Sequence, residues 1–530
     1  MDWSRSGPRE GTAGSVPAGW GWLSGSLAVA LISSFFSRLG LWAEGSLTLG
    51  AARLLFSDSA PRHSWIAGHF FRVSDWWWEA SRGTRQTLAA VISGSVLLSL
   101  PARLARAESG FLAGSTALSP IRATAGQPYP VLWILALLLL WPFIPTTLLA
   151  AAVAALAGAR LLFGLDPRHG GPQFSRSPIG FAWFALGALV VLAMAFSVAP
   201  RASALYTVMW GVSFLAAYLV MDAFRRREQL WHLLWAVSLS AIPVCAFGLW
   251  QAASRIPTAP GWVDSVYFPQ LTTRVFSVFE SPIILGQFLA VSIPVTMYLW
   301  LRSHGWERLW LWMLMGMNFL TLVLTYTRGS WVAVLISVTL LLSWWRRWAL
   351  VVLILLVAVA PLILPEIVVE RFLTAFDLEY GTNRYRMVIW GSVLEMIRDH
   401  PWTGIGPGPV TFDHVYTDYM IPGTRSLHAH NLYLQVALET GILGLMTLMW
   451  FGLAVLRLVS RGSSPRPEGG TGDYTVVLAV ALTGLMLQGL ADFIWYSPKF
   501  MMFFWMLVGA VMASALRARW EREAPCASRP

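Results

Sequence analysis

Apolar residues in this chain are gathered into blocks of about 20, and short polar stretches separate one block from the next. At 1.5 Å per residue, a helix of that length crosses a hydrocarbon core of about 30 Å. The clearest blocks therefore predict transmembrane helices at 179–198, 203–223, 229–250, 283–302, 308–327, 329–345, 347–364, 431–457, 475–495 and 498–516.

The N-terminal third has a less regular pattern. The apolar block 131–163 is too long for one crossing, and Pro142 and Pro145 interrupt it near the middle, so we expect two short helices there. Residues 20–36 predict a further span, which should be a retained anchor because no A-x-A-like cleavage site follows it, and 87–100 is a shorter candidate. The pattern is typical of an all-α, polytopic integral membrane protein with about 12–14 transmembrane helices.

Composition supports this class. Of the 530 residues 56% are hydrophobic and 12% are charged, whereas a soluble domain has about 25% charged residues. These values exclude a water-soluble enzyme, a disordered chain and a coiled coil. Cys245 lies in an apolar block and Cys526 in the C-terminal tail, so neither a disulfide framework nor a cysteine-based metal site is expected.

The net charge of +11 would suggest a nucleic-acid partner in a soluble protein, but here the arginines lie mostly between apolar blocks, so membrane topology explains them and no nucleic acid is expected. Arginines gather in alternate connections, at 225–227, 302–308, 346–347, 457–466 and 517–522. The positive-inside rule makes that face cytoplasmic. The opposite face receives 251–282, Arg328, 365–430 and 496–498, whereas the topology of residues 1–130 stays open.

This alternation divides the chain into five regions. They are an N-terminal membrane region (1–170), a transmembrane helix bundle (171–364), one large extracytoplasmic loop (365–430), C-terminal transmembrane helices (431–516) and a cytoplasmic tail (517–530).

The large loop holds most of the informative polar residues. Its segment 383–400 has the pattern of an amphipathic helix that could lie on the membrane surface, and Pro401 ends it before a glycine-rich bend at 404–409. His430 follows, at the outer mouth of a transmembrane helix. Arginines on the same face are Arg274 before a span, Arg328 between two spans, and Arg384 and Arg386 at the start of the amphipathic segment.

Guanidinium groups bind phosphate through two parallel hydrogen bonds and keep their charge. An arginine cluster at a lipid–water boundary therefore suits a lipid-linked phosphate or pyrophosphate. Simpler interpretations exist: Arg328 could snorkel at a turn, and arginines such as Arg371 could be solvated. A metal site is conceivable from His414, Asp418, His428 and His430, although no metal-binding spacing supports it.

At these residues the sequence resembles the O-antigen ligase and O-antigen polymerase superfamily. His430-Asn431, followed after nine residues by Gly441 and then Gly444, matches that family's H-N-x9-G-x-x-G pattern, and Glu439 within it is of the family type. Three further pieces agree in order, namely Arg274 with Phe279 and Pro282, the run 328–331, and Arg384 to Trp390 followed by 401–408. One position departs from the pattern, because Ile283 stands where the family often has asparagine.

The resemblance implies a metal-independent, inverting glycosyltransferase that needs no cofactor. It implies a donor oligosaccharide on undecaprenyl pyrophosphate and an active site on the extracytoplasmic side of the bacterial inner membrane. Such a reaction needs a base for the acceptor hydroxyl, for which histidine is suited near neutral pH, and positive charge for the leaving pyrophosphate. We expect His430 to be the base and Arg328 with Arg386 to bind the pyrophosphate, with Arg274 and Arg384 as second choices. Asn431 or Glu439 would orient the histidine side.

Several functions remain open at this stage. A polymerase would add the chain to another lipid-linked repeat, with a possible chain-length regulator as partner, and a ligase would move the glycan to a lipid, protein or wall acceptor. The chain length and the extended, arginine-rich N-terminal region resemble the polymerase-type members of polysaccharide clusters, and this resemblance favours the polymerase. A flippase or other transporter should carry ionisable residues near the middle of its spans, but Asp222 and Asp492 lie near span ends. A non-catalytic membrane scaffold is a further alternative.

Overall fold

The computed structural model describes residues 129–163, 179–259, 262, 273–346, 348–375, 377, 381–462 and 470–523. All of them belong to one compact unit, formed by Ala117–Leu165 and Gly171–Pro530. The spans expected at 20–36 and 87–100 lie outside the described residues.

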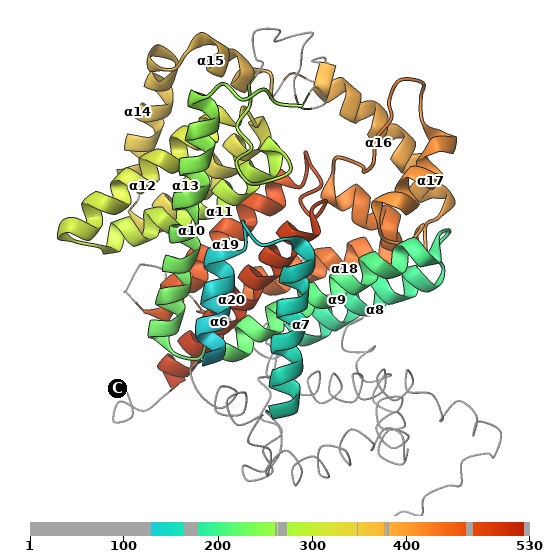
Figure 1. Ribbon diagram of the computed structural model, residues 1–530, viewed down its shortest axis with the longest axis horizontal. Coiled ribbons are helices and arrows are strands. Elements are labelled where there is room, and N and C mark those ends of the chain that lie inside the picture. The colour runs from blue at the N-terminus through green and yellow to red at the C-terminus, as the bar shows by residue number, and fades with distance from the viewer. Residues whose placement is uncertain are drawn as a thin grey trace, which may run out of the picture. The chain divides into compact units, whose positions relative to one another are not determined.

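The described residues form helices and no strands, which confirms the all-α class (Figure 1). The helices are α6 (Tyr129–Leu140), α7 (Thr146–Phe163), α8 (Gly180–Ala195), α9 (Pro200–Ala223), α10 (Arg227–Ala253), α11 (Pro282–Arg302), α12 (Gly305–Leu324), α13 (Arg328–Trp345), α14 (Trp348–Ile363), α15 (Glu366–Leu373), α16 (Gly381–Asp399), α17 (Pro409–Tyr419), α18 (Leu432–Gly462), α19 (Thr471–Gln488) and α20 (Pro498–Glu523).

Seven helices among the described residues are long and apolar enough to cross a membrane, namely α9, α10, α11, α13, α18, α19 and α20. Shorter apolar helices lie within α6, α7, α8 and α14. Helix α12 occupies the block predicted at 308–327 but is not among the seven, and its first turn carries Glu307. The chain is therefore a polytopic membrane protein, as the hydrophobic pattern predicts.

Helices α11 and α20 form the centre of this unit. In each, 89% of the apolar window is buried by other parts of the protein. Helix α11 packs against α10, α12, α13 and α19, and α20 packs against α9, α18 and α19. By contrast, α14 has no buried residue although it is strongly apolar, so its surface is suited to lipid contact.

The predicted break at Pro142 and Pro145 is present between α6 and α7. Such a break leaves backbone carbonyls without helical partners, and the carbonyl of Pro142 accepts a hydrogen bond of 2.7 Å from Nζ of Lys499. Beside it the Trp141 ring stacks on Phe503 of α20 with 4.3 Å between ring centroids. The break thus fastens the α6–α7 hairpin to the central helix.

The amphipathic helix expected at 383–400 is confirmed as α16. Its apolar face is buried inside the protein, because Ile389, Val393 and Met396 belong to a small hydrophobic core within the large loop. Phe412 and Tyr416 of α17 belong to the same core. The loop is therefore a small folded layer beside the start of α18 (Figure 1), and its helices α15 and α17 were not predicted.

Two motif glycines join this layer to α18. Gly441 interrupts the helix with φ 73°, and a Cβ there would lie 2.1 Å from the Trp402 carbonyl oxygen. Gly404 has φ 67°, and its Cβ would lie 2.5 Å from the backbone of Glu439. Because only glycine tolerates both the left-handed backbone and such close contact, the bend after Pro401 docks directly on the kinked helix.

Candidate functional site

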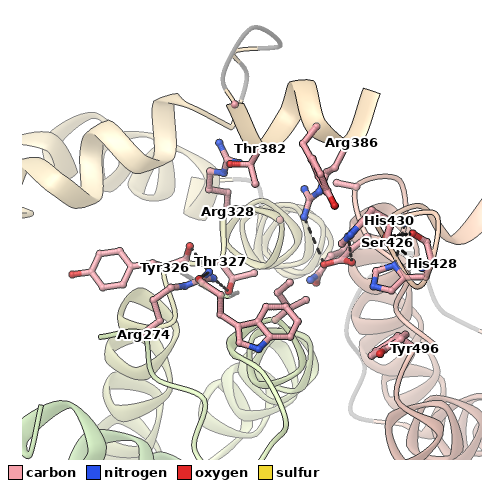
Figure 2. A pocket seen from close by; sticks show the side chains of 18 of the residues that line it. Arg274, Tyr326, Thr327, Arg328, Thr382, Arg386, Ser426, His428, His430 and Tyr496 are labelled. Atoms are coloured by element: carbon pink, nitrogen blue, oxygen red, sulfur yellow. Dashed lines mark hydrogen bonds and ion pairs between the residues drawn. The ribbon is translucent and has the colours of Figure 1, made fainter. Parts of the chain in front are cut away.

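A pocket of about 820 Å³ lies where several connections between helices meet. Its described lining comes from Trp262, Arg274, Ile283 and Arg371 and from residues within 326–329, 381–386, 425–430 and 488–496. These are connections and helix ends predicted for the extracytoplasmic face. In Figure 2, Arg274 and Arg328 are seen on one side of the pocket and His428 and His430 on the other, with Arg386 between them. Sequence-distant residues thus converge as the alternation of arginines predicts.

His430, Asp492 and Arg386 lie in a row at the pocket. Nδ1 of His430 lies 3.7 Å from Oδ1 of Asp492, and Oδ2 of the same carboxyl lies 3.9 Å from a terminal nitrogen of Arg386. The carboxyl is largely buried, whereas the side chains of His430 and Arg386 are each about one-fifth exposed. The pair of Asp492 and His430 can therefore hold the imidazole in one orientation while its other edge is available.

Burial would raise the pKa of Asp492, but the neighbouring His430 and the charge of Arg386 outweigh it and hold the pKa well below its usual range. Asp492 is consequently an ionised carboxylate at neutral pH. A carboxylate in this position stabilises the positive charge that His430 gains when it accepts a proton.

Asp492 was not among the expected site residues, because the apolar block 475–495 placed it within a span. Helix α19 ends at Gln488, so that Asp492 lies in the connection to α20. The sequence signals that could have revealed this connection are Gly489 and Pro498 on either side of the acidic residue.

Arg328 begins α13 and is only 8% exposed. Its two terminal nitrogens donate hydrogen bonds to the carbonyl oxygen of Thr374, at 2.6 Å, and to Oδ1 of Asn383, at 3.1 Å. Arg328 therefore links the transmembrane bundle to the large loop, and its fork of donors faces oxygen atoms at the pocket wall.

Arg274 is also buried and lines the pocket. Its Nε donates to the carbonyl oxygen of Thr325, at 3.0 Å, and a terminal nitrogen donates to Oγ1 of Thr327, at 3.1 Å. These bonds hold the turn that leads into α13. The geometry therefore favours Arg274 as the residue that positions the turn carrying Arg328.

Two further lining residues bear on the expectations. Arg371, which the sequence favoured as a solvated side chain, is 4% exposed and lines the pocket from α15. Ile283, at the position that departs from the family pattern, also lines it. An apolar side chain thus replaces a possible polar contact at that wall.

Three expected residues lie outside the lining. Arg384 is exposed on α16. Asn431 caps α18, since its Oδ1 accepts hydrogen bonds from the backbone N–H groups of Tyr433 and Leu434. Glu439 is buried and accepts hydrogen bonds from the Gly408 N–H and the Gln435 side chain. The last two residues therefore support the histidine side from behind rather than facing the pocket.

A metal could be considered for one grouping of described residues. Ligand atoms of His428, His430 and Asp492 all lie within 4.8 Å of one another. However, Nδ1 of His428 already accepts a hydrogen bond from the His430 backbone N–H, and Arg386 stands beside Asp492. Since a neighbouring cation opposes cation binding, the grouping fits a histidine–carboxylate pair better than a metal centre. His414 and Asp418 of the metal set considered from sequence do not join this grouping.

Fold and site together define a polytopic membrane protein with an arginine-lined pocket at one end of its helices. The O-antigen ligase family model matches residues 288–449, a segment that includes Arg328, Arg386 and His430. The chain is 25% identical over 207 residues to the O-antigen ligase of Salmonella typhimurium, covering 37% of this chain and 51% of that protein. It is 27% identical over 317 residues to the O-antigen ligase of Pseudomonas aeruginosa, covering 57% and 69%.

The chain is thus similar to members of the O-antigen ligase and O-antigen polymerase superfamily, which supports the resemblance seen in its motifs. The chain spans about half the length of the Salmonella relative. Arg274 and Asp492 lie outside the segment that the family model matches.

Proposed function

We propose that the protein transfers a glycan from a lipid pyrophosphate donor to an acceptor hydroxyl. The observation that carries this proposal is the pocket itself, which combines a histidine–carboxylate pair with arginines that can receive a pyrophosphate. The donor we infer is undecaprenyl-pyrophosphate-linked oligosaccharide. Its lipid would remain in the membrane while its pyrophosphate enters the arginine side of the pocket.

In the proposed reaction His430 takes the proton of the acceptor hydroxyl. The acceptor oxygen forms a bond to the anomeric carbon of the donor sugar, and the bond from that carbon to the pyrophosphate oxygen breaks, with inversion. Asp492 stabilises the protonated imidazole. Arg328 and Arg386, with Arg371 beside them, stabilise the negative charge that develops on the leaving pyrophosphate.

Fixed guanidinium groups provide this charge stabilisation without a metal ion or another cofactor. We therefore infer a metal-independent, inverting glycosyltransferase. The energy would come from the activated donor, so that no nucleotide takes part in the transfer.

We infer that the pocket faces the extracytoplasmic side of the inner membrane. Arginine-rich connections such as 225–227 and 302–308 contribute no residue to its described lining, and the positive-inside rule assigns those connections to the cytoplasm. A reporter fused after Arg522 should therefore be cytoplasmic, whereas a tag within the α16–α17 connection should react with a membrane-impermeant reagent.

The acceptor decides between a ligase and a polymerase. Both curated relatives and the family model bear the name of O-antigen ligase, which favours transfer to a separate lipid, protein or wall acceptor. The length-based preference for a polymerase, which would use another lipid-linked repeat and possibly a chain-length regulator, stays as the second proposal.

A reconstitution separates these activities. Purified protein in liposomes would receive an undecaprenyl-pyrophosphate-linked repeat from its own host, first alone and then with lipid A–core acceptor, and the products would be separated by gel. Transfer only after acceptor addition supports a ligase, and a ladder without acceptor supports a polymerase. A third reaction would contain host membranes, which supply other possible acceptors. If the donor is unchanged in all three reactions, the proposal of glycan transfer is wrong.

A further inference from the structure

His428 is a buried residue next to the proposed base, and the proposed reaction gives it no role. It is 8% exposed and lies two residues before His430. Its Nδ1 accepts a hydrogen bond of 3.1 Å from the backbone N–H of His430. A histidine ring that accepts at Nδ1 carries its proton on Nε2, so this contact requires the neutral ring in one tautomer.

The contact coincides with an unusual backbone conformation. His430 has φ 48°, in the left-handed region that residues with a Cβ rarely adopt. Such a conformation persists only where its surroundings hold it. The hydrogen bond to His428 fixes the N–H of the same residue, and on the preceding residue the Ala429 N–H donates to Oε1 of Gln435 at 2.7 Å. The turn is thus held at two successive peptide groups.

The His428 ring also joins the turn to the connection that carries Asp492. Its centroid lies 4.0 Å from that of the His430 ring, 4.7 Å from that of Tyr496 and 6.0 Å from that of Phe493. Tyr496 and Phe493 belong to the α19–α20 connection, as Asp492 does. Figure 2 shows His428 between His430 and Tyr496. The His428 ring therefore contacts His430 and also the connection that carries Asp492, whose relative position determines how His430 meets Asp492.

We propose that His428 is a positioning residue, whose neutral ring holds His430 in its left-handed conformation and directs the imidazole of His430 to Asp492. This inference rests on the proposed function of His430 as the base. Burial favours the same state, because it lowers the pKa of His428 to about 3 and keeps the ring uncharged at neutral pH.

Three substitutions test the hydrogen bond separately from the bulk of the ring. In His428→Asn the side-chain amide occupies the place of Nδ1 and can still accept. In His428→Gln the amide lies farther from the backbone, near the place of Nε2, and His428→Leu has no acceptor. His414, exposed on α17 and away from the pocket lining, provides the matched control His414→Gln.

We expect His428→Gln and His428→Leu to lower kcat about 100-fold, because a misplaced catalytic group costs roughly that much. The KM for the lipid donor should stay within about threefold, since the arginines that bind pyrophosphate are unchanged. His428→Asn should recover kcat to within about tenfold of wild type, and His414→Gln should match wild type.

Equal kcat values for wild type, His428→Gln and His428→Leu would overturn the inference. So would a His428→Asn variant as inactive as His428→Gln when both are folded and bind donor. A loss of thermal stability and of donor binding in all three His428 variants would show a role in folding only, which also overturns it.

A second measurement is independent of activity and so separates this inference from the proposed function. Cryo-electron microscopy of wild type and His428→Gln would compare the position of the His430 imidazole relative to Asp492. We expect the ring to leave the carboxylate in the variant. An unmoved His430 would refute the positioning role even if wild-type protein transfers glycan, and a moved ring would support it even if transfer is never observed.

Discussion

Arginines at the two ends of the helical unit have contrasting environments. At the pocket end, Arg274, Arg328 and Arg371 are each less than 9% exposed. At the far end, where α10 begins and α11 ends, the Arg225 side chain is 51% exposed and pairs locally with Asp222, and Arg308 lies over the Trp300 ring at 4.9 Å. Both sets arise in short connections between apolar blocks.

The contrast distinguishes topology from chemistry. An exposed arginine beside a tryptophan anchors a helix end at an interface at little energetic cost. A buried arginine loses hydration and must recover it from protein oxygens or from a ligand. Arg328 meets the Thr374 carbonyl and Asn383, in a pocket large enough for an anionic group. Burial therefore distinguishes Arg274, Arg328 and Arg371 of the pocket end from the exposed arginines of the far end.

The largest expected effect comes from removing the base at the pocket end. His430→Ala should lower the rate of transfer at least about 1,000-fold, within the range that general bases contribute, while the protein remains folded and inserted. The far-end counterpart His304→Ala, at an exposed position before α12, should be unchanged. Product formation would be followed in reconstituted liposomes, and wild-type rates in His430→Ala would rule out its assignment as the base.

Two arginines on one helix provide a closer comparison. Arg386→Ala removes a lining residue beside Asp492 and should lower kcat/KM about 100-fold, as expected when a charge-assisted contact to a phosphate is lost. Arg384→Ala removes an exposed residue and should stay within about threefold of wild type. Steady-state kinetics with the lipid-linked donor would decide this, and a reversed order would place the pyrophosphate on the other face of α16.

A charge-conserving change tests the fork geometry. Arg328→Lys keeps the positive charge but loses the two-pronged donor, so kcat/KM should fall about tenfold. The same change at the far end, Arg308→Lys, preserves what an interfacial residue needs and should have no measurable effect. Parallel kinetics on both variants are required, because an equal loss would mean that Arg328 acts only as a topological charge.

Much of this arrangement could be predicted from the sequence, for identifiable reasons. The block at 131–163 was correctly divided because two prolines interrupt it, and α16 was recognised from its amphipathic period. His430, Arg274, Arg328 and Arg386 were expected on one face because alternate connections share a side, and the pocket brings all four together. Each of these inferences uses either local composition or the rule that alternate connections between transmembrane helices lie on the same side of the membrane.

What could not be predicted depends on contacts between distant segments. Asp492 meets His430 across 62 positions of sequence (492 − 430), and no local pattern indicates that pairing. In the sequence Arg371 looked like a solvated loop residue. It is buried because the eight-residue helix α15 packs against α13, a contact that no local pattern indicates. Glu439 was expected to orient the histidine side, but the sequence could not indicate that its contact runs through the Gln435 side chain to the Ala429 backbone.

Acid should weaken the pocket end through His428. Its folded-state pKa is about 3, below the ordinary value of about 6.5. Between about pH 3 and about pH 6.5 the unfolded chain therefore binds a proton at His428 that the folded chain does not bind. Stability is therefore lost as pH falls below about 6.5, by up to about 2 kcal/mol at pH 5. Thermal denaturation in detergent at pH 7 and pH 5 would measure it.

The His428→Asn variant is the control for this acid effect, since it has no imidazole to titrate at that position. Its melting temperature should fall less than that of wild type over the same interval. An equal fall in both proteins would assign the acid sensitivity to other groups.

The smallest expected effect concerns metal ions. If buried arginines at the pocket end provide the positive charge for the leaving group, EDTA should leave the rate of transfer unchanged. The far end has no bearing on this outcome, whereas the grouping of His428, His430 and Asp492 does, because it is the part of the pocket that a metal could occupy. If EDTA causes a strong loss that added divalent cation restores, the pair of Asp492 and His430 is part of a metal centre. Arg386 would then be a neighbouring charge that weakens binding of the ion.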